Sequence, residues 1–372
     1  MPSLISEQTH EVLRKLEERI AQQPPGRWLV LTHDNPDPDS LASATLLAKV
    51  LRRRFKQRVT AAYGGIVGRA ENQAMMRHLN LKLSRVRHIR FENYRHFALV
   101  DCQAQTGNNR LPPEIVPDLV LDHHPKRKQT SDVPLADIRT EYGATASIAA
   151  EYLLASELQV SRRNATAVVY AIRSETLDFS RESPGPDRQI YEYFLSRADK
   201  RALGKIRNPR LPQHYFASLA TALGSLSTVD SLILSHLGPV QQPDIVPELA
   251  DLMLRLEGKT WSLCTGVHEE RIYLSIRTTN PRADASKHMR RLVGRKGKGG
   301  GHNMLAGGWT PLNEAQKTDA QKSAKAEREI GRRLAKLLRK NPDRIAPISL
   351  TTLVPASPET SPTPQQPAAA SK

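Results

Sequence analysis

The sequence predicts an α/β protein built from a doubly wound, mainly parallel sheet and a second, smaller α/β domain that faces it across a cleft. From Trp28 to about Arg197, short apolar segments alternate with longer segments of helical periodicity, which is typical of a parallel sheet with crossover helices. Clusters of polar residues directly follow two of the apolar segments, at the strand ends where open α/β sheets bind their ligands. After about residue 228, apolar and helical segments alternate again, which predicts the second domain.

The amino-terminal residues 1–25 predict an amphipathic helix. Val12, Leu13, Leu16 and Ile20 recur at helical spacing before a segment with two prolines and a glycine, which indicates where the helix ends. Glutamates interrupt any continuous apolar segment, so we expect no secretory signal here.

Residues 26–200 form the predicted sheet domain, and residues 201–227 are expected to be a linker. The expected helices of the sheet domain are 40–54, 144–154 and 162–172. The linker is inferred from the proline, glycine and basic residues between positions 202 and 215, because such residues interrupt regular structure.

Residues 228–340 form the predicted second domain. Its expected elements are strands at 228–237, 261–268 and 271–277, a helix at 247–256, and a basic amphipathic helix at 317–340. The last residues, 341–372, are rich in proline, serine, threonine and alanine and are expected to be disordered.

The first polar cluster contains His33, Asp37 and Asp39 and follows the apolar segment 28–31. Its density of carboxylates beside an imidazole suggests a site for a divalent metal. The alternative is a polar turn, since asparagine, aspartate, proline and serine are the residues that turns favour.

A second cluster favours the metal site over the turn. Asp122, His123 and His124 follow the apolar segment 119–121, and neutral imidazole together with carboxylate suits Mn²⁺, Fe²⁺ or Zn²⁺. Asp101 ends another apolar segment. Taken alone it would be an ordinary helix or turn cap, and the two clusters are what make it a candidate ligand.

These motifs, in this order, resemble those of the DHH phosphoesterase superfamily, which includes RecJ-like exonucleases, oligoribonucleases of the nanoRNase type, cyclic-dinucleotide phosphodiesterases and family II inorganic pyrophosphatases. The carboxyl-terminal half adds an independent match. The segment 299–308, Gly-Gly-Gly-His-Asn-Met-Leu-Ala-Gly-Gly, is similar to the glycine-rich histidine loop of the DHHA1 domain. Arg277 is similar to an arginine at a strand end of that domain. The resemblance covers roughly residues 26–312.

The resemblance implies a centre with two divalent ions, for which Mn²⁺ is expected, with Mg²⁺ and Fe²⁺ as alternatives. His33, Asp37 and Asp101 would hold one ion. Asp39, Asp101 and His123 would hold the other, with Asp101 as the bridge. Asp122 would be a ligand or would orient a neighbouring histidine, and His124 would face the substrate phosphate.

The chain departs from the family pattern at Glu175. The family presents aspartate and threonine ahead of an aromatic residue, whereas this chain has Glu175 and Thr176 before Phe179. The extra methylene moves the carboxylate in a site that tolerates about 0.2 Å. Three outcomes are open: the backbone compensates, Asp178 substitutes, or the second ion is held loosely.

The chemistry that such a centre supports is hydrolysis of a phosphoester. Two divalent ions about 3.5 to 4 Å apart activate a water and clamp the attacking and leaving oxygens of a displacement at phosphorus. The sequence contains no Gly-x-Ser-x-Gly motif, and its two cysteines share no motif. Cys102 and Cys264 are expected to be small buried hydrophobic residues in a reducing compartment.

The second domain is expected to bind the substrate. Arg277 offers a planar set of donors for a phosphate. The backbone amides of Gly300 and Gly301 would approach a phosphate closely, and His302 and Asn303 would add polar contacts. The alternative is that the glycines only form a flexible turn before a strand.

Composition agrees with a ligand that carries several negative charges. The chain has 55 Lys and Arg against 38 Asp and Glu, a formal charge of +17, which favours capture of polyanions. The basic segments 287–298 and 317–340 are candidate contacts with RNA or DNA, although a packed helix with a solvated face is the favoured interpretation of the second.

No segment reaches the roughly 20 apolar residues of a membrane span, so we expect a soluble, cytoplasmic protein. Dimers are common in the resembled superfamily, and a homodimer is therefore an option, but nothing in the sequence identifies an interface.

The leading hypothesis for the substrate is a short oligonucleotide or a cyclic dinucleotide, with nucleoside 3′,5′-bisphosphates as a further option. A second hypothesis is a degenerate DHH protein that binds nucleotide or nucleic acid without hydrolysis. A third is an exonuclease acting on long single strands. Only 5% of the residues are aromatic, so base-stacking platforms are sparse and short substrates are preferred.

Overall fold

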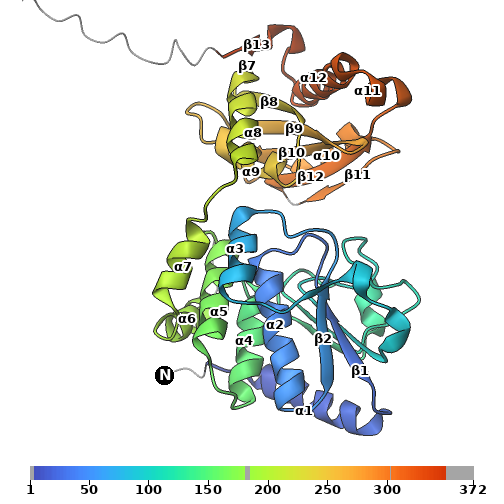
Figure 1. Ribbon diagram of the computed structural model, residues 1–372, viewed down its shortest axis with the longest axis vertical. Helices are drawn as coiled ribbons and strands as arrows, with labels where there is room; N and C mark the ends of the chain where they lie inside the picture. The colour runs from blue at the N-terminus through green and yellow to red at the C-terminus, as the bar shows by residue number, and fades with distance from the viewer. Residues whose placement is uncertain (1–3, 181–184, 302, 349–372) are drawn as a thin grey trace, which may run out of the picture. The chain divides into compact units, whose positions relative to one another are not determined.

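The computed structural model describes residues 4–180, 185–301 and 303–348 (Figure 1). His302 and the part of the predicted disordered tail from residue 349 onward lie outside the described residues, so both expectations stay predictions. The contacts within the chain divide it into two units, Met1–Leu211 and Pro212–Lys372. Each unit is described by itself.

The first unit is built on a six-stranded parallel sheet. Its strands are β1 (Arg27–Leu31), β2 (Arg58–Tyr63), β3 (Ser84–Arg85), β4 (His96–Val100), β5 (Leu119–Asp122) and β6 (Leu135–Ile138). They lie in the order β3-β2-β1-β4-β5-β6, and all five pairs are parallel. The chain therefore winds outward in opposite directions from β1 and β4, which confirms the predicted doubly wound sheet and places its switch point between these two strands.

The unit has seven helices in the described residues. They are α1 (Glu7–Gln22), α2 (Pro38–Arg53), α3 (Ala70–His78), α4 (Thr145–Ala155), α5 (Arg162–Glu175), α6 (Gly185–Leu195) and α7 (Lys200–Arg207). Of these, α1, α2, α4 and α5 correspond to expected helices. Short 3₁₀ turns at Val86–His88, Phe91–Asn93 and Lys128–Asp132 lie in the connections.

Alternate residues of the strands enter two different cores. Trp28 and Val30 belong to a core that includes side chains of α1, α2, α4, α5 and α6. Leu29 and Leu31 belong to a second core, where connecting segments such as the 3₁₀ turn at Phe91–Asn93 contribute the partners. Because both faces are covered, the four residues are almost fully buried, as the strands of parallel sheets usually are.

The second unit is a seven-stranded mixed sheet. Its strands are β7 (Ser227–Val229), β8 (Leu232–Pro239), β9 (Trp261–His268), β10 (Arg271–Thr278), β11 (Lys298–Gly301), β12 (Leu305–Pro311) and β13 (Ala346–Pro347), in the order β11-β12-β10-β9-β8-β7-β13. Its helices are α8 (Gln213–Gly224), α9 (Ile245–Met253), α10 (Ala285–Val293), α11 (Glu314–Thr318) and α12 (Ala320–Leu337), with a 3₁₀ turn at Pro342–Arg344. Helices α10 and α12 share one core with the sheet, and α8 and α9 share another.

Four local expectations differ from the structure. Residues 341–348, expected to belong to the disordered tail, include a 3₁₀ turn at Pro342–Arg344 and strand β13. The segment expected as one strand at 228–237 is a hairpin, β7 and β8, because Asp230 adopts a positive φ of 49° that turns the chain. The basic helix expected at 317–340 is divided into α11 and α12, since the side chain of Asp319 accepts hydrogen bonds from the amides of Gln321 and Lys322 and so begins a new helix. The expected linker 201–227 is largely helical, in α7 and α8.

Both cysteines are free and buried, as expected. Among the residues that the structure describes, no helix combines the length and the apolar character needed to cross a membrane.

Candidate metal centre

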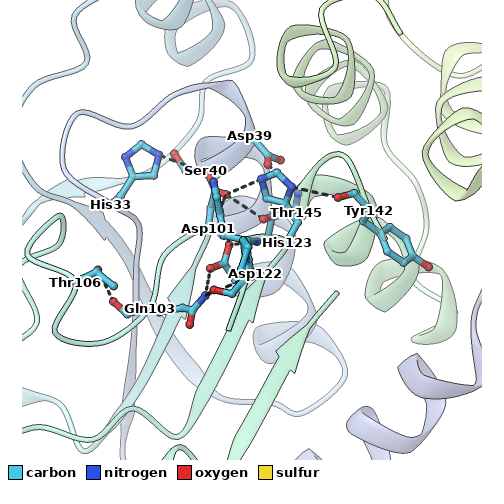
Figure 2. Close-up of polar contacts among 12 residues, drawn as sticks. His33, Asp39, Ser40, Asp101, Gln103, Thr106, Asp122, His123, Tyr142 and Thr145 are labelled. Atoms are coloured by element: carbon cyan, nitrogen blue, oxygen red, sulfur yellow. Dashed lines mark hydrogen bonds and ion pairs between the residues drawn. The ribbon is translucent and has the colours of Figure 1, made fainter. Parts of the chain in front are cut away.

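The candidate ligands come together at the carboxyl ends of three adjacent strands, β1, β4 and β5 (Figure 2). His33 follows β1, Asp101 follows β4, and Asp122 is the last residue of β5. These strands flank the switch point, where the connections leave in opposite directions and open space for a ligand. Residues about 90 positions apart in the sequence therefore belong to one site.

The first group consists of His33, Asp37 and Asp101, whose ligand atoms lie within 4.8 Å of one another. His33 Nε2 lies 3.5 Å from Asp37 Oδ2 and 3.5 Å from Asp101 Oδ2. These distances are too long for hydrogen bonds. They are close to the roughly 3 to 3.5 Å that separates two ligands bound about 2.1 Å from one ion.

The second group consists of Asp101, His123 and His124. Asp101 Oδ1 lies 3.7 Å from His123 Nε2 and 3.8 Å from His124 Nδ1. Asp101 thus directs one carboxylate oxygen toward each group. Its φ of +57° is a conformation that aspartate tolerates better than most residues, and it turns the chain immediately after β4.

The hydrogen bonds of the two histidines leave the correct nitrogen for a metal. His33 Nδ1 lies 2.9 Å from the carbonyl oxygen of Asp34, and His123 Nδ1 lies 3.2 Å from that of Tyr142. A carbonyl only accepts, so Nδ1 is the donor in both and Nε2 faces the carboxylates. Nε2 of His123 is buried without a hydrogen-bond partner in the described part of the chain, and a divalent ion would satisfy it. The residues therefore fit a metal.

The electrostatics of the first group favour a cation. Burial lowers the pKa of His33, but the charges of Asp37 and Asp101 outweigh it and raise that pKa well above its usual value. Burial raises the pKa of Asp37, yet the neighbouring His33 brings it below its usual range. Carboxylates that hold a proton on an imidazole also favour a metal ion, which would displace that proton.

Asp37 explains why the first cluster also resembles a turn. Its Oδ1 accepts a hydrogen bond of 2.9 Å from the amide of Ser40 and so caps α2, with Pro38 in the first position of the helix. The other oxygen faces His33. One carboxylate thus serves as a helix cap and as a candidate ligand. The nearby Asp34 pairs instead with Arg110.

Asp39, which the resemblance implies as a ligand, lies in neither group. Its two oxygens accept hydrogen bonds from the amides of Thr145 (2.8 Å) and Ala146 (2.6 Å), at the start of α4. Burial raises the pKa of Asp39 well above its usual value, and the charges of Asp101 and other nearby carboxylates add to this. Asp39 therefore joins α2 to the amino terminus of α4 beside the centre, where its carboxylate retains lone pairs for a further contact.

Asp122 orients His124. Its Oδ1 lies 2.9 Å from Nδ1 of His124, and its Oδ2 accepts a hydrogen bond of 2.8 Å from Gln103. Burial lowers the pKa of His124, but the hydrogen bond with Asp122 and the charge of Asp101 raise it to about 9. Asp122 belongs to neither ligand group. Of the two roles expected for it, ligand or orienting residue, its contact with His124 favours the second.

Glu175, the departure from the family pattern, ends α5 close to the centre. Its negative charge helps to raise the pKa of Asp39 and of His124. Asp178, the alternative carboxylate for this position, pairs with Arg173 and is 64% exposed. Of Glu175 and Asp178, Glu175 is therefore the one whose carboxylate lies near the centre.

Three residues of the site were not recognised from the sequence. Thr145 donates a hydrogen bond of 3.0 Å to Asp101 Oδ1. Gln103 holds Asp122, and Tyr142 accepts from His123. Gln103 could have been found two positions after Asp101, at the same strand end. Tyr142 acts through its carbonyl, so its side chain gives no signal.

The expected substrate-binding residues of the second unit lie on the sheet around β10 and β11. Arg277, at the end of β10, is 8% exposed. It pairs through Nε with Asp251, and its Nη1 donates to the carbonyl oxygens of Ile276 and Ala306. Two of its nitrogens are therefore already engaged within this unit.

The glycine-rich segment is an edge strand rather than a loop. Gly300 and Gly301 pair with Gly307 and Ala306 of β12. A side chain at Gly301 would place its Cβ 2.2 Å from the carbonyl oxygen of Leu305, and its φ is +149°, so only glycine fits there. A Cβ at Gly300 would meet no other atom within 4 Å, so this position does not require glycine for lack of space. Asn303 is exposed and its carbonyl accepts from the amide of Ala285.

Comparison with known proteins agrees with both halves of the sequence pattern. The model of the DHH family N-terminal domain matches residues 27–172, and that of the DHHA1 domain matches residues 230–328. An uncharacterized protein of Methanocaldococcus jannaschii is 34% identical over 297 residues, which is 79% of this chain and 60% of that protein. The chain thus spans less than two thirds of the relative's length.

Solved structures show a similar fold. The crystal structure of an exopolyphosphatase-related protein from Bacteroides fragilis covers 89% of this chain and 100% of its own, with a TM-score of 0.65 and 15% identity. At this identity the likeness concerns the fold alone. The C-Ala domain of Aquifex aeolicus alanyl-tRNA synthetase, at 21% identity, covers 27% of this chain and 96% of its own with a TM-score of 0.21, which is too low to bear on the fold. The two matched domains show that this chain belongs to the DHH/DHHA1 superfamily, which includes phosphoesterases.

Proposed function

We propose that this protein is a metal-dependent phosphoesterase that hydrolyses phosphodiester bonds of short oligonucleotides or cyclic dinucleotides. The observation that carries the proposal is Asp101, which directs Oδ2 toward His33 and Oδ1 toward His123. A carboxylate shared in this way suits two neighbouring ions. Mn²⁺ is the expected ion, because the ligands are imidazole and carboxylate and no thiolate takes part among the described residues.

The chain's own residues have distinct roles in this proposal. His33, Asp37, Asp101 and His123 would hold the metal, which would lower the pKa of a bound water and neutralise charge on the phosphoryl oxygens. His124 is 35% exposed, compared with 13% for His123, so we assign His124 to the substrate. Its raised pKa keeps it protonated at neutral pH, and Asp122 orients it to donate a hydrogen bond to a phosphate oxygen.

The second unit supports a substrate that carries phosphates. Its α10 and the segment that follows include Lys287, Arg290, Arg291, Arg295, Lys296 and Lys298, all of them exposed. The segment 287–298 contains no acidic residue. We propose that these cations bind the phosphates of a nucleotide, and that α12 adds further contacts to longer RNA or DNA. Such contacts contribute affinity that falls as salt rises.

Two alternatives lead to different measurements. A protein in which Glu175 has weakened one metal position would bind nucleotide without hydrolysing it. In that case calorimetry would detect one Mn²⁺ ion or none, with nucleotide affinity retained. An exonuclease would instead prefer long single strands to dinucleotides. The charge of Glu175 raises the pKa of Asp39 and of His124, so its carboxylate lies near the centre under either alternative.

The test is an assay panel with and without Mn²⁺ on dinucleotides, cyclic dinucleotides, 3′,5′-bisphosphates, long single strands, pyrophosphate and polyphosphate. We expect release of mononucleotides from dinucleotides that stops in excess chelator. Asp101→Asn should lower the rate by about 10³-fold, since metal catalysis contributes several kcal/mol.

Asp34→Asn is the matched control. Asp34 lies in the same loop but pairs with Arg110, so we expect this variant to retain activity within about threefold of the wild type, as surface changes usually do. Activity that survives Asp101→Asn, or that is indifferent to chelator, would exclude the proposed mechanism.

A further inference from the structure

Helix α1 lies ahead of the part of the chain that matches the DHH domain, residues 27–172, yet its first turn is tied into that domain by buried hydrogen bonds. Three donors converge on one carboxylate oxygen, Glu151 Oε2 in α4. They are the Ser6 amide (3.0 Å), the Ser6 hydroxyl (2.8 Å) and the Thr9 hydroxyl (2.6 Å). Glu151 and Thr9 are almost fully buried, so the bond between them is shielded from solvent, and the two bonds from Ser6 are partly buried.

The other oxygen of Glu151 leads to the metal centre. Oε1 accepts a short hydrogen bond from the hydroxyl of Tyr142. The carbonyl oxygen of the same residue, Tyr142, accepts from Nδ1 of His123. Figure 2 shows Tyr142 beside His123, with the dashed line between them. A path therefore runs from Ser6 and Thr9 to a candidate metal ligand, through the hydrogen bonds of Glu151 and then through Tyr142, whose covalent structure joins its hydroxyl to its carbonyl.

Arg139 makes this path rigid. Its Nη1 donates to Ser6 Oγ (2.8 Å) and to Glu151 Oε2 (3.1 Å), and its Nη2 donates to Thr9 Oγ1 (2.8 Å) and to Asp137 Oδ2 (2.7 Å). Burial would raise the pKa of Glu151, but its hydrogen bonds with Thr9 and Tyr142 keep it below its usual value. Glu151 is therefore an ionised acceptor at neutral pH, and each of its oxygens has a fixed donor.

We propose that the docked first turn of α1 positions His123, with Glu151 and Tyr142 as the positioning residues. The proposal rests on the metal centre of the proposed function. By fixing the Tyr142 carbonyl, the path holds the proton of His123 on Nδ1 and directs Nε2 toward Asp101. Partners that orient a metal-binding histidine in this way commonly change metal affinity by about 10–100-fold when they are lost.

The variants that test this remove one hydroxyl each. Tyr142→Phe keeps the ring and the carbonyl, and Thr9→Val keeps the shape of the side chain. We expect each to weaken Mn²⁺ binding about 3- to 10-fold in calorimetry, less than the loss of a direct partner of the histidine. The double variant should lose little more than either single variant, because both changes break the same path.

Arg19→Met is the matched control, since Arg19 holds the other end of α1 through Asp118, with Nη2 2.8 Å from Oδ1. It should lower stability and leave Mn²⁺ affinity unchanged. If Arg19→Met weakens Mn²⁺ binding as much as Thr9→Val does, α1 matters only for stability and the proposal fails. It also fails if Tyr142→Phe and Thr9→Val bind Mn²⁺ like the wild type.

A second readout does not depend on metal. In nuclear magnetic resonance of the protein with chelator, the Nδ1 proton of His123 should exchange with water at least about tenfold faster in Tyr142→Phe than in the wild type, which corresponds to about 1.4 kcal/mol. Equal exchange would overturn the positioning proposal. A wild type that binds no Mn²⁺ would instead contradict the proposed function, so the two failures are distinguishable.

Discussion

Each end of the parallel sheet carries a histidine beside a buried aspartate, and the two ends differ in which side chains surround the pair. At the amino ends of β4 and β5, His96 Nδ1 lies 3.5 Å from Asp118 Oδ2. At the carboxyl ends, His123 Nε2 lies 3.7 Å from Asp101 Oδ1. Similar residues at similar distances thus occur at both ends of one sheet.

The partners of the buried aspartate distinguish the two ends of the sheet. Asp118 accepts hydrogen bonds from Arg19, from Gln23 and from the amide of Phe97, and His96 Nε2 bonds to the carbonyl oxygen of Pro24. Asp101 pairs with histidines but with no lysine or arginine in the described part of the chain, and Nε2 of His123 has no hydrogen-bond partner there. A buried carboxylate with an arginine stabilises the fold, whereas one that faces imidazoles and a threonine hydroxyl, without a lysine or arginine, favours a metal ion.

The largest expected difference concerns activity. His123→Ala should lower the rate of phosphodiester hydrolysis by about 10³-fold, because a metal ligand worth several kcal/mol is lost. His96→Ala removes a histidine that is buried at the other end of the sheet, and the folded variant should keep the wild-type rate. Steady-state rates in saturating Mn²⁺ compare the two, and equal losses would remove the distinction between the ends.

The next difference concerns stability and has opposite signs at the two ends. Asp118→Asn should lower the free energy of unfolding by about 3 kcal/mol, since it leaves Arg19 without its partner. Asp101→Asn, in excess chelator, should raise the free energy of unfolding by about 1 kcal/mol, because repulsion with the carboxylate of Asp39 is relieved at a functional site. Urea unfolding measures both. A large destabilisation by Asp101→Asn would show that its carboxylate is a structural group like that of Asp118.

The smallest effect is stabilisation by metal. Mn²⁺ at a hundred times its dissociation constant should raise the free energy of unfolding of the wild type by about 2.7 kcal/mol. The same increase is expected for Asp118→Asn and none for Asp101→Asn. Thermal unfolding with and without Mn²⁺ provides the comparison, and a response of Asp101→Asn equal to that of the wild type would place the ion elsewhere.

Several parts of the fold followed directly from local sequence. The alternation of apolar strands and amphipathic helices predicted the sheet, and the limits of β9 and of α5 differ from the expected ones by at most three residues. These elements have strong periodicity and clear ends. The hairpin at Asp230 and the break at Asp319 were missed, because each depends on one residue whose side chain or backbone ends an element inside a continuous pattern.

The candidate site likewise combines residues that the local sequence predicted and residues that it missed. His33, Asp37, Asp101, His123 and His124 were recognised because each follows an apolar strand, and such strand ends meet at one edge of a parallel sheet. Thr145 and Tyr142 were missed because their role depends on contacts that only the folded chain makes. For Arg277 and the glycine segment, the sequence indicated the positions but not the ion pair with Asp251 or the edge strand.

The sequence by itself determined the superfamily, the class of the sheet and the candidate ligands, because these depend on residue type and on order along the chain. Only the tertiary structure decided what each carboxylate faces. Asp39 turns to the amides of α4, Asp122 to His124, and Asp101 to both groups of ligands. These roles follow from distances between strands far apart in the sequence, which no local pattern encodes.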